Sequence, residues 1–251
     1  MLGGHALITG GGSGIGRASA LALADAGCAV TIVGRNFDRL AAVRAERAGL
    51  LALACDVGDE AAVTRTIAAA IHAHGPVAIL VNAAGSAETA RFEKTTTATW
   101  DRLWRGNVMG AVHMSRAVLP AMRALPAGRI VNIASTAALK GYAYASAYTA
   151  TNHALLGLTR ALAVELAGTA ITVNAVCPGY TDTDIVRDAV ATIVARTGRS
   201  EAEALANFTG TNPQGRLIDP IEVAESVLWL ASAGARSITG QPITVAGGEI
   251  M

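Results

Sequence analysis

Short apolar runs alternate along the chain with longer segments in which apolar residues recur at helical spacing. The runs carry little polar alternation, and strands that are apolar on both faces are typical of a parallel sheet covered by helices. The alternation predicts an α/β fold, a doubly wound parallel sheet of about seven strands flanked by helices. The predicted strands are Ala6–Thr9, Ala29–Val33, Leu50–Ala54, Ala78–Asn82, Arg129–Ala134, Ile171–Val176 and Ile243–Val245. The predicted helices are Ile15–Ala26, Phe37–Ala48, Glu60–His74, Ala98–Arg123, Ala147–Ala167 and Ile221–Ala231.

One segment breaks this rhythm. Residues Asp182–Asn212 are helical in composition, lie between two predicted strands, and end at Asn212-Pro213. Insertions beyond the carboxyl ends of strands usually form lids over ligands in open α/β sheets. We therefore predict a substrate lid at about 182–212, with a passive surface helix pair as the alternative. No linker rich in Pro, Gly or Ser divides the chain, so 1–251 is expected to be a single domain.

Composition excludes several classes of protein. Hydrophobic residues make up 52% and charged residues 16%, which is enough to bury a large core. No stretch of ~20 apolar residues could span a bilayer, and the first residues do not resemble a signal peptide, so we expect a soluble, cytoplasmic protein. The net charge is +1 without a basic stripe, which argues against nucleic-acid binding. Three scattered cysteines and five histidines match no metal pattern, so we expect no metal and reduced thiols.

A glycine-rich turn, Thr9-Gly10-Gly11-Gly12-Ser13-Gly14-Ile15-Gly16, joins the first predicted strand to the first helix. Glycines there let the backbone approach a pyrophosphate, whose charge meets the helix N-terminus. A glycine-rich turn alone is a weak signal, because any tight strand–helix connection can contain glycine. Its position between a strand and a helix, with a second strand ending about twenty residues later, favours a dinucleotide site.

The end of the second predicted strand reports on the ribose of such a dinucleotide. A carboxylate there accepts hydrogen bonds from a 2′-hydroxyl, whereas an arginine pairs with a 2′-phosphate. This chain reads Val33-Gly34-Arg35-Asn36, with a guanidinium and no acid. The sequence therefore predicts a preference for NADP(H), with NAD(H) as the alternative if Arg35 only stacks on adenine.

These residues, with others further along, resemble the short-chain dehydrogenase/reductase family over essentially the whole chain. The shared motifs are Thr9-Gly10-x-x-x-Gly14-x-Gly16, Asp56, Asn82-Ala83-Ala84-Gly85, Asn107, Ser135, Tyr148, and Pro178-Gly179 followed by Thr183. In this order they are highly specific. The resemblance implies a Rossmann-type fold, a homotetramer with the Ala98–Arg123 and Ala147–Ala167 helices at one interface, and an oxidoreductase that interconverts a ketone and a secondary alcohol.

The resemblance also implies roles for individual residues. Ser135 would polarise the substrate carbonyl, Tyr148 would exchange a proton with the substrate oxygen, and Asn107 would hold a water in the proton relay. Asp56 with Val57 would hold the adenine, and Thr183 the nicotinamide carboxamide. The predicted catalytic residues are Ser135, Tyr148, Asn107 and Asn152, the last at the position of the family lysine. The predicted cofactor-binding residues are Gly10, Ser13, Gly14, Ile15, Gly16, Arg35, Asp56, Val57, Asn82, Ala83, Ala84, Gly85, Tyr148, Asn152, Pro178, Gly179 and Thr183.

Asn152 departs from the family pattern. Residues four apart share a helix face, so Tyr148 and Asn152 are expected in one pocket, but asparagine brings no charge to lower the tyrosine pKa. His153 is predicted to point off this face, and Lys140 could approach only if its loop folds inward. Gly106, where the family usually has a β-branched residue, is a second departure. We hypothesise that both replace a standard Val and Lys, which would leave the fold intact and turnover impaired.

Two functions remain open from the sequence. One is a reductase of 3-oxoacyl thioesters or small aryl or alkyl ketones, because Asn212–Leu217 and the closing Val245-Ala246-Gly247-Gly248 resemble 3-oxoacyl reductases and 3-hydroxyacyl dehydrogenases. The other is a nucleotide-binding pseudoenzyme, which Asn152 favours and the retained Ser135, Tyr148 and Asn107 oppose.

Overall fold

A seven-stranded, all-parallel sheet runs through the computed structural model, which describes residues 2–250. Its strand order is β3-β2-β1-β4-β5-β6-β7. The first three strands are added outward from β1 on one side, and β4 to β7 are then added outward on the other side of β1. The doubly wound α/β prediction is confirmed. The strands are β1 (His5–Thr9), β2 (Ala29–Gly34), β3 (Leu51–Ala54), β4 (Val77–Asn82), β5 (Gly128–Ile133), β6 (Ile171–Pro178) and β7 (Pro242–Val245).

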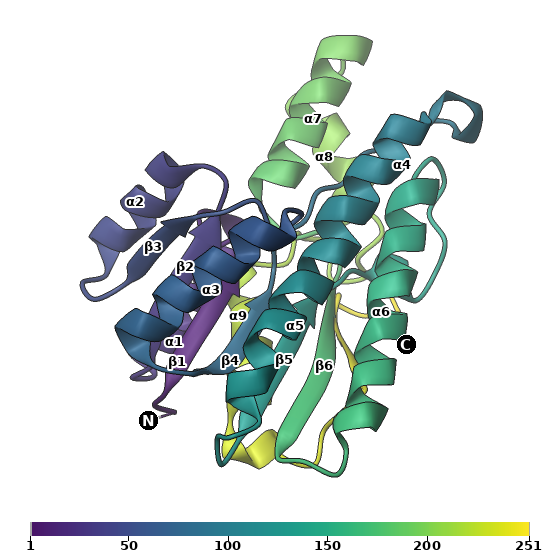
Figure 1. Cartoon of the computed structure of the whole chain (residues 1–251). Coiled ribbons are helices and arrows are strands. Elements are labelled where there is room, and N and C mark those ends of the chain that lie inside the picture. Colours follow the sequence, from purple (N-terminus) through teal and green to yellow (C-terminus); the bar gives the residue numbers. More distant parts are fainter. Residues whose placement is uncertain (1, 251) are drawn as a thin grey trace.

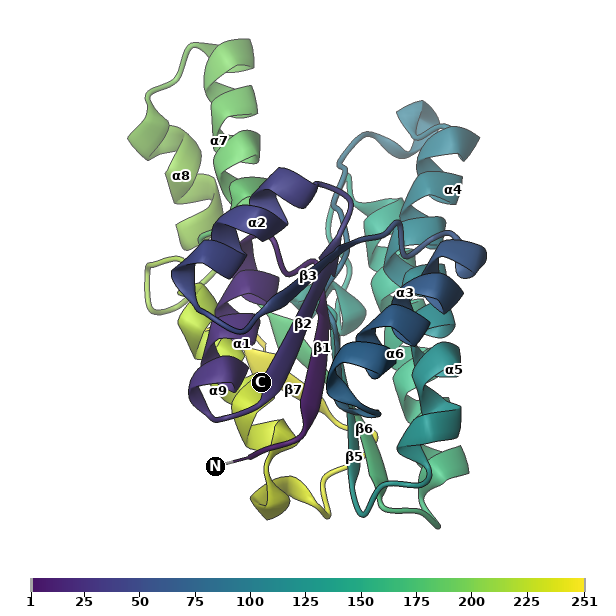
Figure 2. The ribbon, with the colours of Figure 1, turned by 60° about the vertical axis from the view of Figure 1, so that its left-hand side comes forward.

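Helices cover both faces of this sheet. Helices α1 and α9 pack together on one face, while α3 and α5 pack together on the other, with α6 against β6 (Figures 1 and 2). Leu7, Ile8 and Leu80 are fully buried in the strands between these layers. The helices are α1 (Gly14–Asp25), α2 (Phe37–Glu46), α3 (Glu60–His74), α4 (Thr97–Trp104), α5 (Gly110–Met122), α6 (Ser146–Leu166), α7 (Asp184–Thr197), α8 (Glu201–Thr209) and α9 (Pro220–Ala231).

The prediction of a single helix over Ala98–Arg123 is wrong in one respect. A π-helical turn, Arg105–Met109, interrupts it and separates α4 from α5. The periodicity of the sequence did not reveal this turn because its five residues are too few to show a period of their own. Such turns occur often at functional sites, and here the turn contains Asn107.

Local capping sets several helix starts. The side chain of Asn36 accepts a hydrogen bond from the backbone nitrogen of Arg39 at 3.1 Å, which fixes the first turn of α2. Asp219 and Glu222 form a reciprocal capping box at the start of α9, where Pro220 takes the first helical position. Asp219 thereby sets where the chain re-enters the main fold after α7 and α8.

The segment 182–212 contains α7 and α8 and projects above the carboxyl ends of the strands (Figure 1). Two backbone hydrogen bonds join its two ends, from Asp182 to Ile218 and from Ile218 to Tyr180, both 2.9 Å long. Its own small core contains Val186, Val190 and Ala204. Among the helices of residues 2–250, none is long and apolar enough to cross a membrane.

Candidate active site

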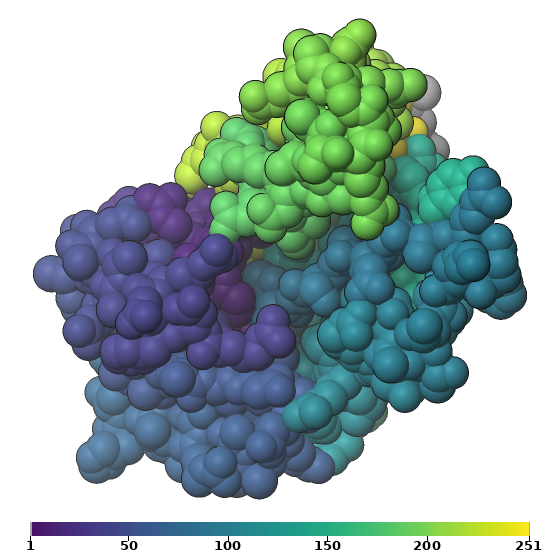
Figure 3. All heavy atoms as spheres, turned by 90° about the horizontal axis from the view of Figure 1, so that it is seen from above, coloured from purple at the N-terminus to yellow at the C-terminus, as the bar shows by residue number. Residues whose placement is uncertain are grey.

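A cavity of about 1080 Å³ lies at the carboxyl ends of β1 and β4, where the strand order reverses. This reversal point is the usual ligand site of open α/β sheets, and the volume is at the upper end for small-molecule sites. Seen from above, the green α7 and α8 region borders a hollow that lies between the purple N-terminal segments and the blue-teal region that contains α4 (Figure 3).

The glycine-rich turn forms one wall of the cavity. Gly10 has φ +67°, and a Cβ there would lie 2.8 Å from the carbonyl oxygen of Ala83. A Cβ on Gly16 would overlap the carbonyl oxygen of Gly10. Only glycine therefore lets the turn close against β4 and bring the N-terminus of α1 to the cavity. A helix N-terminus with free backbone N–H groups is suited to bind a phosphate.

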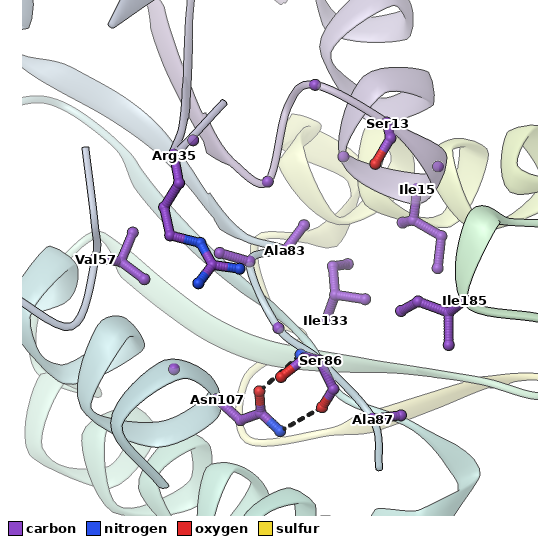
Figure 4. Close-up of a pocket in the computed structure, with 18 of the residues that line it drawn as sticks. Ser13, Ile15, Arg35, Val57, Ala83, Ser86, Ala87, Asn107, Ile133 and Ile185 are labelled. Atoms are coloured by element: carbon purple, nitrogen blue, oxygen red, sulfur yellow. Dashed lines mark hydrogen bonds between the residues drawn. The ribbon is translucent and has the colours of Figure 1, made fainter. Parts of the chain in front are cut away.

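Arg35 lies at the end of the cavity formed by β2 and β3. Its exposed side chain extends from the end of β2 into the space between Val57 and Ala83 (Figure 4). Among residues 2–250, no carboxylate forms an ion pair with it. Asp56 lines the same end and is paired with Arg105 at 3.3 Å, while its other oxygen accepts a bond from the Gly58 nitrogen. The guanidinium of Arg35 is therefore available for an anionic ligand.

Asn107 ties the loop after β4 to the π-helical turn. Its side chain accepts a hydrogen bond from the nitrogen of Ser86 and donates one to the oxygen of the same residue, both 2.9 Å (Figure 4). It also donates to the hydroxyl of Thr151 at 3.3 Å, which connects this loop to α6. Asn107 lines the cavity, so it holds two walls of the site in a fixed relation.

Asn82 acts below the cavity, within the sheet. Its amide donates to Asn132 at 2.8 Å, and Asn132 donates to Thr159 on α6 at 2.8 Å. The hydroxyl of Thr9 accepts bonds from the nitrogens of Ala83 and Ala84, both at 3.0 Å. These buried bonds hold β1, β4, β5 and α6 together beneath the site. Asn82 therefore supports the cavity without lining it.

Tyr148 and Asn152 both line the cavity, on the same face of α6, as their spacing predicted. The Asn152 amide donates to the backbone oxygen of Tyr148 at 2.9 Å. Burial raises the pKa of Tyr148, and hydrogen bonds with Ser135 and Asn152 oppose the shift only in part. At neutral pH the phenol therefore stays protonated and can donate a proton.

Ser135 follows β5 and begins a short 3₁₀ turn. Its hydroxyl oxygen accepts a bond from the nitrogen of Ala137 at 3.1 Å, and its side chain is close enough to Tyr148 to lower the pKa of that phenol in part. Ser135 itself is not among the residues that line the cavity, nor are Pro178 and Gly179. Pro178 ends β6, and Gly179 pairs with the oxygen of Val245 at 3.0 Å. Ser135 is nevertheless close to Tyr148, which does line the cavity.

Within residues 2–250, neither Lys140 nor His153 takes the place of a lysine at position 152. Lys140 pairs with the buried carboxylate of Glu249 at 2.9 Å and lies over the ring of Tyr142, 4.9 Å from its centre. His153 is exposed and interacts with the backbone oxygen of Thr149 at 3.0 Å. Neither residue lines the cavity. The two side chains that oppose the raised pKa of Tyr148, Ser135 and Asn152, are therefore both neutral.

Sequence reasoning missed part of the wall opposite α6. Arg39 and Asp184 line the cavity and form an ion pair with a nitrogen–oxygen distance of 2.9 Å. The pair joins α2 to α7, 145 positions apart, so neither periodicity nor motif spacing could reveal it. Ile185 next to Asp184 also faces the cavity (Figure 4). Thr183, which the sequence did predict, lies beside Gly14 on the same wall.

The rest of the described chain adds no metal site. Within residues 2–250, no group of three or more His, Cys, Asp or Glu side chains could hold a metal ion. Cys28, Cys55 and Cys177 are buried and free, and burial raises the pKa of the Cys177 thiol to about 12. The chemistry of the site therefore depends on its hydroxyl, amide and guanidinium groups and on what the cavity binds.

Comparison with known proteins gives a consistent result. A family model for short chain dehydrogenases matches residues 4–193. A protein named as a ketoacyl reductase of the monensin polyketide synthase of Streptomyces virginiae is 41% identical, covering 97% of this chain and 95% of its own. Acetoacetyl-CoA reductase of Shinella zoogloeoides is 37% identical, covering 97% of each. The crystal structure of a variant actinorhodin polyketide ketoreductase with NADPH superposes with a TM-score of 0.93 at 35% identity, covering 98% of this chain and 97% of that one.

Proposed function

The chain belongs to the short-chain dehydrogenase family, and from that premise we propose that it is an NADP(H)-dependent ketoreductase acting on 3-oxoacyl thioesters or related small ketones. The observation that carries the proposal is the position of Tyr148, which lines the large cavity on the same side as Asn152 and lies close enough to Ser135 for that side chain to act on its pKa. The names of the relatives support the substrate class, since they include a ketoacyl reductase and an acetoacetyl-CoA reductase.

The cavity fits a dinucleotide. The glycine-only approach of Gly10 to Ala83 leaves backbone N–H groups at the start of α1 for the pyrophosphate. Arg35, which has no ion-pair partner in residues 2–250, would hold the 2′-phosphate, and Asp56 with Val57 would border the adenine. Thr183 and Ile185 would cover the nicotinamide end, with the segment 182–212 as a lid. The cofactor, when bound, would supply the hydride.

The residues around Tyr148 would supply the acid chemistry. Ser135 would donate a hydrogen bond to the substrate carbonyl oxygen, and Tyr148 would give its proton to the oxygen as charge develops there. Because burial raises the pKa of Tyr148, this acid form is fully populated at neutral pH. The reverse reaction needs the phenolate, which the same environment disfavours. We therefore infer that the site favours ketone reduction over alcohol oxidation.

Asn152 is the reason for considering a second possible function. Without a cation near Tyr148, turnover would be impaired, and an inactive nucleotide-binding protein is the alternative to the reductase. The pairing of Lys140 with Glu249 favours this alternative, because it keeps that cation away from Tyr148. The retained Ser135 and Asn107 favour the enzyme.

A substrate panel with both cofactors tests the proposal. Purified protein would be mixed with NADPH or NADH and with acetoacetyl-CoA, a short 3-oxoacyl thioester, and aryl and alkyl ketones, while the absorbance of the reduced cofactor is followed. We expect turnover with NADPH on at least one 3-oxoacyl substrate, and loss of that turnover in Ser135→Ala. NADPH binding, seen by fluorescence, without turnover on any substrate would instead support the inactive form. Equal or tighter binding of NADH would contradict the assigned cofactor preference.

A further inference from the structure

The wall that sequence reasoning missed contains a second arginine that lines the cavity. Arg35 and Arg39 both line the cavity, four positions apart at the start of α2. Arg35 has no carboxylate partner among residues 2–250, whereas Arg39 is bound to Asp184 of the lid at 2.9 Å. The cavity thus has one guanidinium without an ion-pair partner in residues 2–250 and one that a carboxylate occupies.

The position of Arg39 follows from its neighbours. A Cβ built on Gly12 would lie only 3.2 Å from the Cβ of Arg39, so the absence of a side chain at Gly12 lets Arg39 lie against the glycine-rich turn. Its backbone is fixed by the Asn36 cap. Its guanidinium, by contrast, is on a long and mostly exposed side chain, which is 57% accessible to solvent. Arg39 can therefore exchange partners without movement of α2.

Asp184 is a weak partner for this guanidinium. Its side chain is 44% exposed, and solvent-exposed ion pairs contribute little because water screens both charges. Arg39 donates only one hydrogen bond to Asp184, whereas a phosphate carries more charge than a carboxylate and can accept two parallel hydrogen bonds from a guanidinium. A phosphate bound at Arg35 would therefore compete with Asp184 for Arg39.

We propose that Arg39 is a second ligand for the 2′-phosphate of NADP(H), which Asp184 of the lid holds until the cofactor binds. The proposal rests on the assignment of NADP(H) made above and deepens it. NADPH would draw Arg39 away from Asp184 and release the ion pair that joins α2 to α7. NADH has no phosphate there and would leave the Arg39–Asp184 pair intact. Discrimination between the cofactors thus depends on a lid residue that need not touch either one.

Asp184→Asn tests the competition directly. Dissociation constants for NADPH and NADH would be measured on the full chain by quenching of intrinsic fluorescence. We expect Asp184→Asn to bind NADPH about two- to fivefold more tightly, the range of an exposed ion pair, and NADH unchanged. Weaker binding of both cofactors would mean that the pair only closes the lid and would overturn the proposal. Unchanged binding of NADPH would overturn it as well.

The neighbouring ion pair provides a matched control. Asp182 pairs with Arg187 at 3.0 Å, at the root of the same lid and with similar exposure, but neither residue lines the cavity. Asp182→Asn removes the same charge, so an equal gain in NADPH affinity would mean that net charge alone is responsible. We expect no change in the ratio of the two dissociation constants for this variant.

Arg39→Gln completes the test. We expect it to weaken NADPH binding about tenfold, the loss of one charge-assisted hydrogen bond, and to leave NADH within about twofold. In the double variant Arg39→Gln/Asp184→Asn, the change at Asp184 should not increase the affinity for NADPH, because the Arg39 guanidinium that it would release is no longer present. A gain in the double variant would exclude Arg39 as the mediator. If the unchanged protein binds neither cofactor, the proposed function fails, whereas binding that all these variants leave unaltered refutes only the role of Arg39.

Discussion

At the scale of single residues, we infer from the surroundings of Tyr148 that the proposed reaction is favoured in the direction of reduction. Burial raises the pKa of its phenol above the ordinary value of about 10, and only neutral groups oppose the shift. A proton donor is therefore always present below that pH, whereas a phenolate base is scarce. Reduction and alcohol oxidation should consequently respond to pH in different ways.

We expect the rate of alcohol oxidation to rise about tenfold per pH unit between pH 7 and 9, because the phenolate fraction of Tyr148 rises in that proportion below its pKa. Ketone reduction should lack this rise. Initial rates in both directions, at saturating cofactor and substrate, would show the difference. A plateau of the oxidation rate near pH 8 would mean that another group lowers the pKa of Tyr148, contrary to its surroundings in the structure.

Asn152→Lys should restore the missing charge. A cation on the helix face of Tyr148 that lowered its pKa by two or three units would raise oxidation at pH 7 by about 10²–10³-fold. Asn152→Met, which adds length without charge, serves as the control and should give no gain. Oxidation that is no faster in the lysine variant than in the methionine variant would refute the catalytic interpretation of position 152.

At the scale of elements, the π-helical turn between α4 and α5 brings together a required glycine and a dispensable one. Gly106 lies within the turn, and a Cβ built there meets nothing within 4 Å. Gly110 begins α5, and its Cβ would lie 2.5 Å from a methyl carbon of Val57. Only the second glycine is required by close packing, between α5 and the residue that borders the adenine end of the cavity.

Gly106→Ala should therefore stabilise the protein, by up to about 1 kcal/mol, because alanine restricts the unfolded chain and favours helix. Gly110→Ala should destabilise it, since Val57 would have to move in a packed core. Thermal unfolding measures both: a rise of about 2–4 °C is expected for the first variant and a fall for the second. A lower melting temperature for Gly106→Ala would show that this turn needs glycine for its backbone conformation.

At the scale of the whole molecule, apolar side chains remain exposed on the helices predicted to form a subunit interface. Val164 on α6 is 79% exposed and Trp104 on α4 is 44% exposed. Isolated exposed apolar residues are common, but here they lie on the two helical segments that the family resemblance assigns to one interface. We propose that the chain forms a homotetramer through this surface.

Light scattering should give a mass about four times the 25.4 kDa of one chain. Val164→Glu places a charge on the proposed interface and should shift the protein toward smaller species. Phe37→Glu, a change of the same kind at a 46% exposed position on α2, should leave the mass unaltered. A monomeric mass for the unchanged protein at micromolar concentration would contradict the tetramer.

Local pattern was sufficient to predict much of this molecule from its sequence. Apolar runs identified the strands because a strand buried on both faces has nowhere to place polar side chains. The glycine-rich turn could be recognised in the sequence because Gly10 approaches Ala83, and Gly16 approaches Gly10, too closely for any side chain, so both positions require glycine. Tyr148 and Asn152 were placed on one cavity wall because helix geometry alone brings residues four apart onto one face.

Tertiary structure decided what depends on residues far apart in the chain. The partner of Lys140 is Glu249, and the partner of Arg39 is Asp184, and no local rule specifies either pair. The π-helical turn at Asn107 is likewise fixed by the Ser86 loop and by Thr151, which hold its side chain from two directions. Sequence by itself determined which chemical groups the site would contain. Only packing of distant segments determined which of those groups are free, because a charge is available to a ligand only where the fold leaves it without a partner.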